Sequence, residues 1–312
     1  MSLKRNTKPN VVVICGPTAT GKTSAAIELA EIVSGEIIGA DSMQVYRYMD
    51  IGTAKPTADE QACVPHHMID IVDPDELFDA QKYAKMAHEI IMKLFARGQT
   101  PLVVGGTGLY IKALVHGLFE ACPAGHDLRR RLKKQAEAHG TDFLHKRLKR
   151  CDPDAATRLH PHDTYRIIRA LEIYELTGKT ISDHHGTHRF QDGPFRVLKI
   201  GLNLDREILY NRIDSRVDAM IEAGLIEEVK GLLGKGYLPG LKSMQSIGYR
   251  HMVDFIENRM SCDEALRTLK RDTRRYAKRQ LTWFNADPEI VWFNPEQLDD
   301  IGRKIKNFLK VI

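Results

Sequence analysis

Residues 10–23 read NVVVICGPTATGKT, an apolar run followed directly by a glycine-rich turn and a Lys-Thr pair. Asn10 to Cys15 is short, β-branched and apolar, which is typical of a strand buried on both faces of a parallel sheet. Thr23 to Val33 has helical periodicity, and the turn between fits the pattern G-x-x-x-x-G-K-[ST]. A strand, this turn and a helix in that order predict a phosphate-binding P-loop.

Each part of this turn has a physical role in holding phosphate. The glycines let backbone N–H groups converge on phosphate oxygens, and the helix N-terminus adds partial positive charge. Lys22 neutralises phosphate charge, and the Thr23 hydroxyl is suited to hold Mg²⁺. The predicted diphosphate- or nucleotide-binding residues are Gly16, Pro17, Thr18, Ala19, Thr20, Gly21, Lys22 and Thr23.

The rest of the chain predicts an α/β fold with an inserted helical domain. Further buried strands are expected where apolar runs recur, at residues 36–40, 101–104, 195–204 and 289–293. Helical segments separate them, so we expect a parallel sheet flanked by helices. Asp205 is a plausible N-cap for a helix over 206–223, with Gly224 as its stop. Residues 117–193 are helix formers dense in Arg, Lys and His, and we predict a small all-helical domain there, inserted into a core of residues 1–116 and 194–312.

Composition narrows the class of protein. The chain has 312 residues, of which 43% are hydrophobic, and its 46 Lys and Arg exceed its 41 Asp and Glu by five. We therefore expect a globular protein with a weak preference for anionic partners. Neither a secretory signal nor a membrane-spanning run is evident, so we expect a cytoplasmic protein, no membrane partner and, by default, a monomer. Five cysteines without a Cys-x-x-Cys pair indicate reduced thiols.

A P-loop alone does not identify the reaction, because motors, switches, kinases and transferases all contain one. The residues that accompany it must distinguish among these classes. The strand at 101–104 runs into Gly105-Gly106-Thr107-Gly108 and lacks the acid that NTPases use to hold metal. This absence argues against a motor or a switch protein, although an acid within residues 69–73 could take that role and keeps both hypotheses open. Asp41 follows the second strand, where open α/β sheets place ligands, and could accept a proton from a nucleophile. The alternative is that Asp41 only caps a turn.

A basic helix is predicted over residues 264–284. Its cations at 267, 270, 271, 274, 275 and 278 share one side, and only Glu264 and Asp272 oppose them. Such a stripe suits a polynucleotide backbone, whereas an ordinary solvated face mixes both signs of charge. We interpret His184 to His188 as an exposed loop rather than a metal site, and His66-His67 as structural.

Taken together, the motifs resemble those of the tRNA dimethylallyltransferases, also called tRNA isopentenyltransferases, in their compact bacterial form. The matching segments, in order, are GPTATGKT (16–23), DSMQVY (41–46), IGTAKP (51–56), HHMIDIVDP (66–74), GGTGLY (105–110), YRIIRALEIYELTGK (165–179), QSIGYR (245–250) and YAKRQLTWF (276–284). They span nearly the whole chain, so the resemblance is specific even though any one of them is short.

The resemblance implies a reaction and a set of roles. A dimethylallyl group would move from dimethylallyl diphosphate to the exocyclic N6 amine of the adenosine 3′-adjacent to the anticodon, position 37 of tRNA, releasing diphosphate. Lys22, Arg216 and Mg²⁺ near Thr23 would stabilise the leaving diphosphate, Asp41 would act as the base, and Thr107 would help to position the reacting groups. The inserted domain would grip the anticodon stem-loop.

With the basic helix, the resemblance also assigns tRNA contacts. These fall on Asp41, Ser42, Met43, Gln44, Thr107, Arg129, Tyr165, Arg166, Ile167, Ile168, Arg169, Gln245, Ser246, Ile247, Gly248, Tyr249, Arg250, Arg274, Arg275, Lys278, Arg279 and Gln280. Three alternatives remain: a small-metabolite kinase with ATP as donor, an adenylate isopentenyltransferase, and a non-enzymatic RNA-binding module. The first and second leave the basic helix unexplained, and the third leaves the P-loop without a purpose.

Overall fold

A computed structural model describes residues 8–117, 126–183 and 193–310. It divides into two compact units, Met1–His116 with Pro194–Ile312 and Gly117–Gly193. The histidine-rich run at 184–188 lies outside the described residues. Of the cysteines that the structure describes, Cys15, Cys63, Cys151 and Cys262 are free thiols. None of the described helices is long and apolar enough to cross a membrane.

The larger unit is built on a six-stranded sheet in which every strand pair is parallel. In the order β3-β2-β4-β1-β5-β6, the strands are His66–His67, Gly35–Gly39, Thr100–Gly105, Asn10–Cys15, Arg196–Leu202 and Ile290–Phe293. The predicted α/β class is therefore confirmed, including the strands contributed from the C-terminal part of the chain. The two-residue edge strand β3 was missed because a pair of histidines carries no strand pattern.

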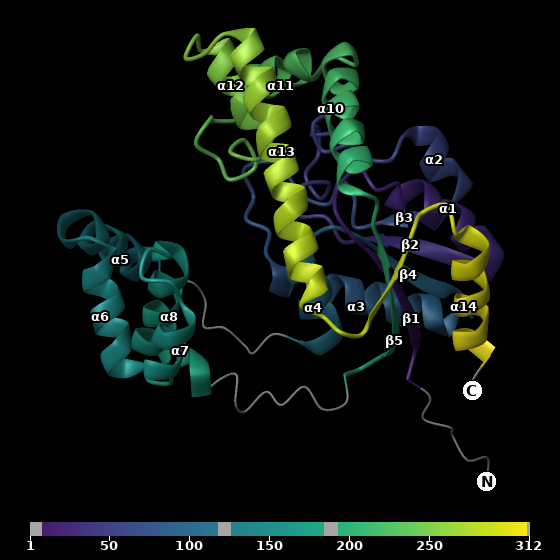
Figure 1. Ribbon diagram of the computed structural model, residues 1–312, viewed down its shortest axis with the longest axis horizontal. Coiled ribbons are helices and arrows are strands. Elements are labelled where there is room, and N and C mark those ends of the chain that lie inside the picture. The colour runs from purple at the N-terminus through teal and green to yellow at the C-terminus, as the bar shows by residue number, and fades with distance from the viewer. Residues whose placement is uncertain (1–7, 118–125, 184–192, 311–312) are drawn as a thin grey trace. The chain divides into compact units, whose positions relative to one another are not determined.

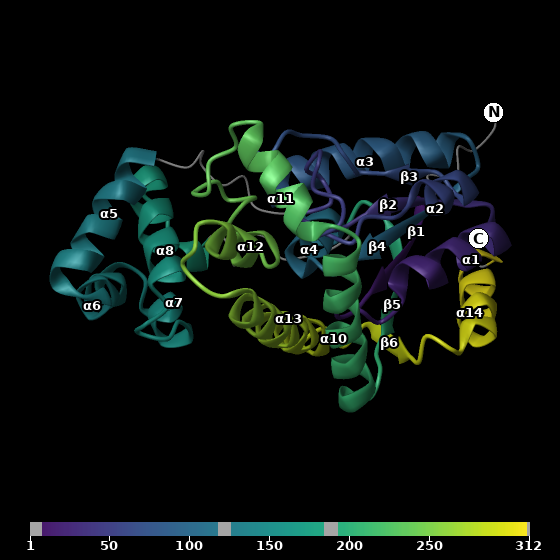
Figure 2. The same cartoon turned by 90° about the horizontal axis from the view of Figure 1, so that it is seen from above.

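Helices cover both faces of this sheet. α1 (Lys22–Val33) and α14 (Leu298–Lys310) share an apolar core with one face, through residues such as Leu29, Leu102 and Ile301. α3 (Ala80–Ala96) packs on β4 and on α4 (Gly108–His116), and Figure 2 shows it on the side of the sheet opposite α14. The short helix α2 (Ala58–Cys63) precedes β3. The strands are consequently buried on both faces, which explains why they are apolar throughout.

Four further helices follow β5. They are α10 (Arg206–Glu222), α11 (Leu225–Gly234), α12 (Tyr249–Ile256) and α13 (Cys262–Asn285). α13 packs against both α10 and α12, as Figures 1 and 2 show. Asp205 does occupy the N-cap position of α10, but its side chain makes no capping hydrogen bond there, and Gly224 is left-handed with φ 100°.

The smaller unit is helical throughout its described residues. It contains α5 (His126–His139), α6 (Thr141–Cys151), α7 (Pro153–Arg158) and α8 (Thr164–Thr177). Apolar side chains from all four helices pack into one core, among them Leu132, Leu144, Ala155 and Leu171. This unit has a hydrophobic core of its own, as expected of a separate folding unit.

Candidate active site

The predicted P-loop joins β1 to α1 at the edge where the parallel strands end. Gly16 has φ +143°, and a Cβ placed on it would lie 2.3 Å from the backbone oxygen of Leu202 on β5. Gly21, at φ 85°, is the N-cap of α1 and makes no side-chain capping bond. Glycine is thus required by close approach at the first position and favoured by backbone angle at the second. The free N-terminus of α1 is left facing the turn.

Two cations converge on this turn. Lys22 donates to the carbonyl of Pro17, and Arg216 of α10 donates through Nη1 to the Thr18 hydroxyl, 3.2 Å away. Burial, followed by the nearby charge of Arg216, lowers the pKa of Lys22 to about 8. Burial also lowers the pKa of Arg216, while Asp41 opposes that shift. Two poorly solvated cations with little opposing charge form a site that an anion would stabilise.

An open cavity of about 400 Å³ adjoins these groups. It is lined by Thr18, Ala19, Gly21, Lys22, Thr23, Ser24, Asp41, Gln44, Thr53, Ala54, Lys55, Glu60, Val104, Gly105, Gly106, Arg212, Arg216, Tyr276 and Gln280. The lining comes from three loops at the ends of neighbouring strands and from helices α1, α2, α10 and α13. Its size falls within the range of small-molecule sites, and it lies where open α/β sheets bind ligands.

Asp41 lines the cavity and begins a turn that fixes the orientation of its carboxylate. Its Oδ1 accepts from the backbone N–H groups of Met43 at 2.8 Å and Gln44 at 3.3 Å. Its Oδ2 has no hydrogen-bond partner among the described residues. The Thr107 hydroxyl accepts from the N–H of Ser42 at 3.0 Å, tying the β4–α4 loop to the same turn. Asp41 therefore caps its turn with one oxygen, while the other has no hydrogen bond to a described residue.

Two residues of α13 complete the site, and sequence reasoning did not give either of them this role. Gln280 is 5% exposed; its Oε1 accepts from the N–H of Thr18 at 2.9 Å, and its Nε2 donates to the carbonyl of Gly106 at 2.9 Å. Tyr276 hydrogen-bonds Thr107, and its pKa is raised first by burial and then by Asp41. The matching run YAKRQLTWF signalled that this segment matters, but only the fold shows that α13 crosses two site loops.

Known proteins share this architecture. Residues 44–287 match the family model described as IPP transferase. The chain belongs to the IPP transferase family. A tRNA dimethylallyltransferase of Desulfosudis oleivorans is 54% identical over 305 residues, covering 97% of each chain. The crystal structure of the full-length tRNA isopentenylpyrophosphate transferase from Bacillus halodurans is 42% identical with a TM-score of 0.73, covering 97% of both chains. The predicted resemblance is confirmed.

A eukaryotic member of the family has been solved as a dimethylallyltransferase acting on tRNA. It is 30% identical, with a TM-score of 0.81, and the match covers 96% of this chain and 77% of that one. The relationship therefore extends over both the sheet and the helices of the family fold, not over the P-loop alone.

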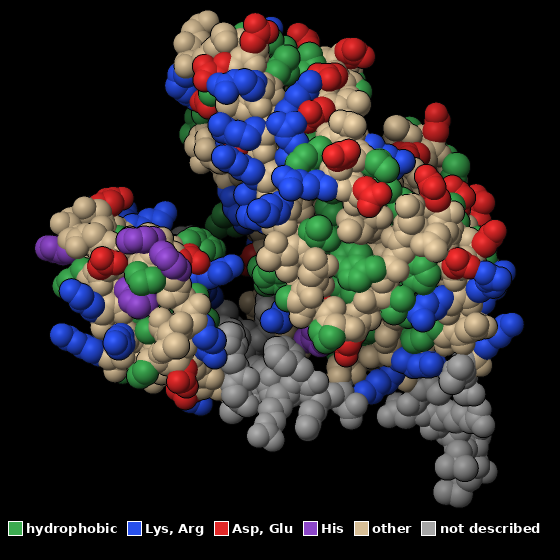
Figure 3. All heavy atoms as spheres, in the orientation of Figure 1, with side chains coloured by type: hydrophobic (Ala, Val, Ile, Leu, Met, Phe, Trp, Pro, Cys, Tyr) green, Lys and Arg blue, Asp and Glu red, His purple; other side chains and the backbone are tan. Residues whose placement is uncertain are grey.

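The basic face of α13 differs from its prediction in one respect. Acids of α10, which lie far away in sequence and close in space, neutralise part of it, and Asp272 of α13 itself pairs with two more cations. The ion pairs are Lys270 with Asp218 at 2.6 Å, Arg274 with Asp214 at 2.7 Å, and Arg271 and Arg275 with Asp272 at 2.9 and 3.7 Å. Lys278 and Arg279 are exposed and form no ion pair with any described residue. Figure 3 shows Lys and Arg side chains gathered along α13, with acidic side chains beside them.

Several residues that the resemblance assigns to tRNA contact are structural in the smaller unit. Ile167 and Ile168 are 0% and 4% exposed, packed in its core, so their side chains cannot face RNA in this structure. Arg129 and Arg169 both donate at 2.7 Å to the fully buried Glu172, whose pKa is lowered by these pairs against the effect of burial. Tyr165, in contrast, is 74% exposed.

The segment 245–250 divides in the same way. Gln245 is exposed, and its side chain donates to the carbonyl of Pro239 at 2.8 Å. Arg250 pairs with Asp272 at 2.6 Å and is partly exposed. Tyr249 and Gly248 are buried, and the Tyr249 hydroxyl donates to Glu228 at 2.6 Å. Direct contact with a macromolecule is thus open to the first part of the segment and to Arg250, but not to the Tyr249 side chain.

The residues around Thr23 suit a magnesium ion that a bound diphosphate would share. The Thr23 side chain lines the cavity, has no hydrogen-bond partner among the described residues, and lies in the first turn of α1. Among the described residues no cluster of three or more His, Cys, Asp or Glu side chains could hold a metal alone. Mg²⁺ is usually held by one or two protein oxygens together with substrate phosphates and water, so this sparse donor set fits.

Proposed function

We propose that this protein transfers a dimethylallyl group from dimethylallyl diphosphate to the exocyclic N6 amine of adenosine 37, beside the anticodon of tRNA, and releases diphosphate. The observation that carries the proposal is a single cavity that the cations Lys22 and Arg216, beside the P-loop, share with Asp41. One carboxylate oxygen of Asp41 has no hydrogen-bond partner among the described residues. Family membership and the names of relatives across the full chain support a prenyl transfer to tRNA. We also propose that the protein acts as a monomer.

The diphosphate end of the cavity would stabilise the leaving group. As the carbon–oxygen bond breaks, negative charge grows on the diphosphate, and preorganised cations and N–H groups lower the energy of that state. Lys22, Arg216 and the N-terminus of α1 would provide such groups at the cavity. Mg²⁺, held by Thr23 and the diphosphate, would supply further charge neutralisation.

The other end would receive the acceptor base. The adenine N6 forms the new bond to carbon as the bond to diphosphate oxygen breaks, and the nitrogen then loses one proton. Asp41 Oδ2 is the acceptor for that proton, since Oδ1 is already occupied by two backbone N–H groups. Thr107 holds the turn that presents Asp41. The base must leave its stack to reach this depth, and a loop allows this for only a few kcal/mol.

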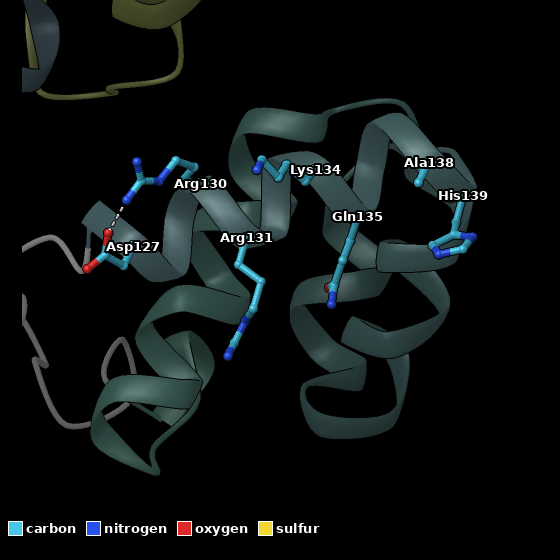
Figure 4. A pocket seen from close by; sticks show the side chains of 7 residues that line it. All are labelled: Asp127, Arg130, Arg131, Lys134, Gln135, Ala138 and His139. Carbon is cyan, nitrogen blue, oxygen red and sulfur yellow. Dashed lines mark hydrogen bonds and ion pairs between the residues drawn. The ribbon is translucent and has the colours of Figure 1, made fainter.

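The anticodon stem-loop would bind through exposed cations of both units. On α13 these are Lys278 and Arg279, together with Arg275, which is exposed and pairs with Asp272 only at a long distance of 3.7 Å. On α5, Arg130, Arg131 and Lys134 line an open hollow with Gln135 and His139 (Figure 4). Arg130 pairs with Asp127, and Arg131 pairs with Glu175 at 2.6 Å, which leaves Lys134 the free cation among the described lining residues. Phosphate contacts of this kind give affinity rather than sequence choice.

The deciding experiment is a transfer assay with labelled dimethylallyl diphosphate and two acceptors offered separately. Unmodified tRNA carrying an adenosine at position 37 should be labelled, and AMP should not. Label in AMP alone would make the protein an adenylate isopentenyltransferase instead. No transfer to either acceptor, combined with consumption of ATP in a parallel reaction, would replace the proposal with a kinase.

A further inference from the structure

One wall of the cavity is a strained loop. Residues 46–55 connect the Asp41 turn to α2, and Thr53, Ala54 and Lys55 line the cavity. Tyr48 has φ 66° and Ala54 has φ 48°, left-handed angles that side-chain-bearing residues seldom adopt. Backbone in such angles persists only where the surrounding structure fixes it from several directions.

The first fixing contact comes from inside the loop. The side chain of Lys55 is 4% exposed, and its Nζ donates to the carbonyl of Tyr46 at 3.0 Å and to Asp70 at 2.6 Å, as well as to Asp50. This cation therefore joins the two ends of the loop to each other and to the segment before Val72. Its charge is fully paired within the protein.

The second contact comes from outside the loop, from Glu228 of α11. Its Oε2 accepts from the backbone N–H groups of Asp50 and Ile51, both at 2.8 Å, and its Oε1 accepts from that of Gly52 at 3.1 Å. Tyr249 adds its hydroxyl to Oε1 at 2.6 Å. Three successive N–H groups on one carboxylate form a nest with charge-assisted hydrogen bonds, which are stronger than neutral ones.

Close packing supports the same clamp. A Cβ placed on Gly52 would lie 2.5 Å from the Tyr249 ring and 2.9 Å from a methyl group of Leu225. Gly52 is thus pressed between α11 and α12 with no space for a side chain. The clamp leaves little freedom for the loop to shift.

From the loop, hydrogen bonds lead on to the reacting groups. The side-chain amide of Gln44 donates to the carbonyls of Thr53 at 3.2 Å and Ala54 at 3.0 Å. The backbone N–H of Gln44 donates to Asp41 Oδ1. Displacing the loop would therefore move the turn that sets the direction of the Asp41 carboxylate.

We propose that Glu228 is a positioning residue for the transfer reaction: it holds loop 50–54, and through Gln44 the direction of Asp41, without touching the cavity itself. The inference rests on the proposed function. It also gives a reason for the motif IGTAKP, since Gly52 is its clamped glycine and Lys55 its internal anchor. Through Glu228, helix α11 would thereby contribute to the positioning of the catalytic groups.

The test is the variant Glu228→Gln, compared with Glu227→Gln on the same helix. Glutamine keeps the shape but turns an N–H₂ group toward the N–H donors of Asp50 and Ile51. We expect kcat for transfer to tRNA to fall by about ten- to a hundredfold, the size of effect that a displacement of about 1 Å produces. The Kd for inorganic diphosphate and the Kd for tRNA should stay within about twofold. Glu227, whose side chain is 71% exposed, should give wild-type values in all three measurements.

Two further variants keep the test decisive if Glu228→Gln fails to fold. Tyr249→Phe removes one hydrogen bond from Glu228 and leaves the three N–H bonds, so kcat should fall less than in Glu228→Gln. Gly52→Ala should lower kcat strongly, because its methyl group meets the Tyr249 ring. Wild-type kcat in the variants that fold, or a loss confined to diphosphate affinity, would overturn the inference. Absence of transfer by the wild-type protein and by Glu227→Gln would instead overturn the proposed function.

Discussion

Replacing Gln280 with leucine is expected to damage both stability and diphosphate binding, because this one side chain joins two loops of the site. Its amide satisfies the N–H of Thr18 and the carbonyl of Gly106, each at 2.9 Å, and is almost fully buried. Leucine has nearly the same volume but satisfies neither group. A buried backbone group without a partner costs about 1–3 kcal/mol. Because the Gly106 carbonyl is buried while the Thr18 N–H borders the cavity, the free energy of unfolding should fall by about 1–3 kcal/mol.

Urea denaturation measures the first effect, and calorimetric titration with inorganic diphosphate measures the second. The Kd for diphosphate should rise because the Thr18 N–H loses the contact that orients the P-loop. Gln245→Leu is the control, since that glutamine is exposed and should change unfolding by no more than about 0.5 kcal/mol. A Gln280→Leu protein with wild-type unfolding and wild-type diphosphate affinity would refute the bridging role.

Further predictions concern charge and proton transfer. Because the pKa of Lys22 is lowered to about 8, its side chain is cationic below that pH and neutral above it. The affinity for diphosphate should therefore fall as pH rises from 7 to 9, and Lys22→Arg should remove this dependence. An equal decline in both proteins would contradict the prediction. Asp41→Asn should lower kcat by about 10²–10⁴ while tRNA binding persists, and full activity would exclude Asp41 as the base. Thr23→Ala should raise the Mg²⁺ concentration needed for half-maximal transfer, whereas an identical metal titration would remove its role. Lys278→Ala should reduce the salt slope of tRNA binding by about 0.7–0.9, more than Arg274→Ala does, because Arg274 is already paired; equal effects would count against this distinction.

The fold and the strand–turn–helix geometry of residues 10–33 were predictable because their signals are local. A buried strand, a glycine-rich turn and a helix follow one another in residues 10–33, and the α/β order repeats the same pattern. Asp41 was predictable because it directly follows a strand at the edge where ligands bind. In each case the residues that decide the structure are close together in the sequence.

Contacts across long stretches of chain were not predictable from these patterns. Gln280 meets Thr18 across 262 positions, and Glu228 meets the loop at Gly52 across 176. Two of the acids that neutralise α13, Asp214 and Asp218, belong to α10, so a charge pattern taken along α13 alone overstated its free positive charge. Ile167 and Ile168 shared a family segment with exposed neighbours, and only helix packing showed that they are buried.

The most direct test of the account is to locate the transferred group within the tRNA. After reaction with labelled dimethylallyl diphosphate, the tRNA would be digested to nucleosides and the label assigned by mass spectrometry. We predict label on N6 of the adenosine at position 37, and none in a tRNA that carries guanosine there. Label at another position, or equal labelling of the guanosine-containing tRNA, would contradict it.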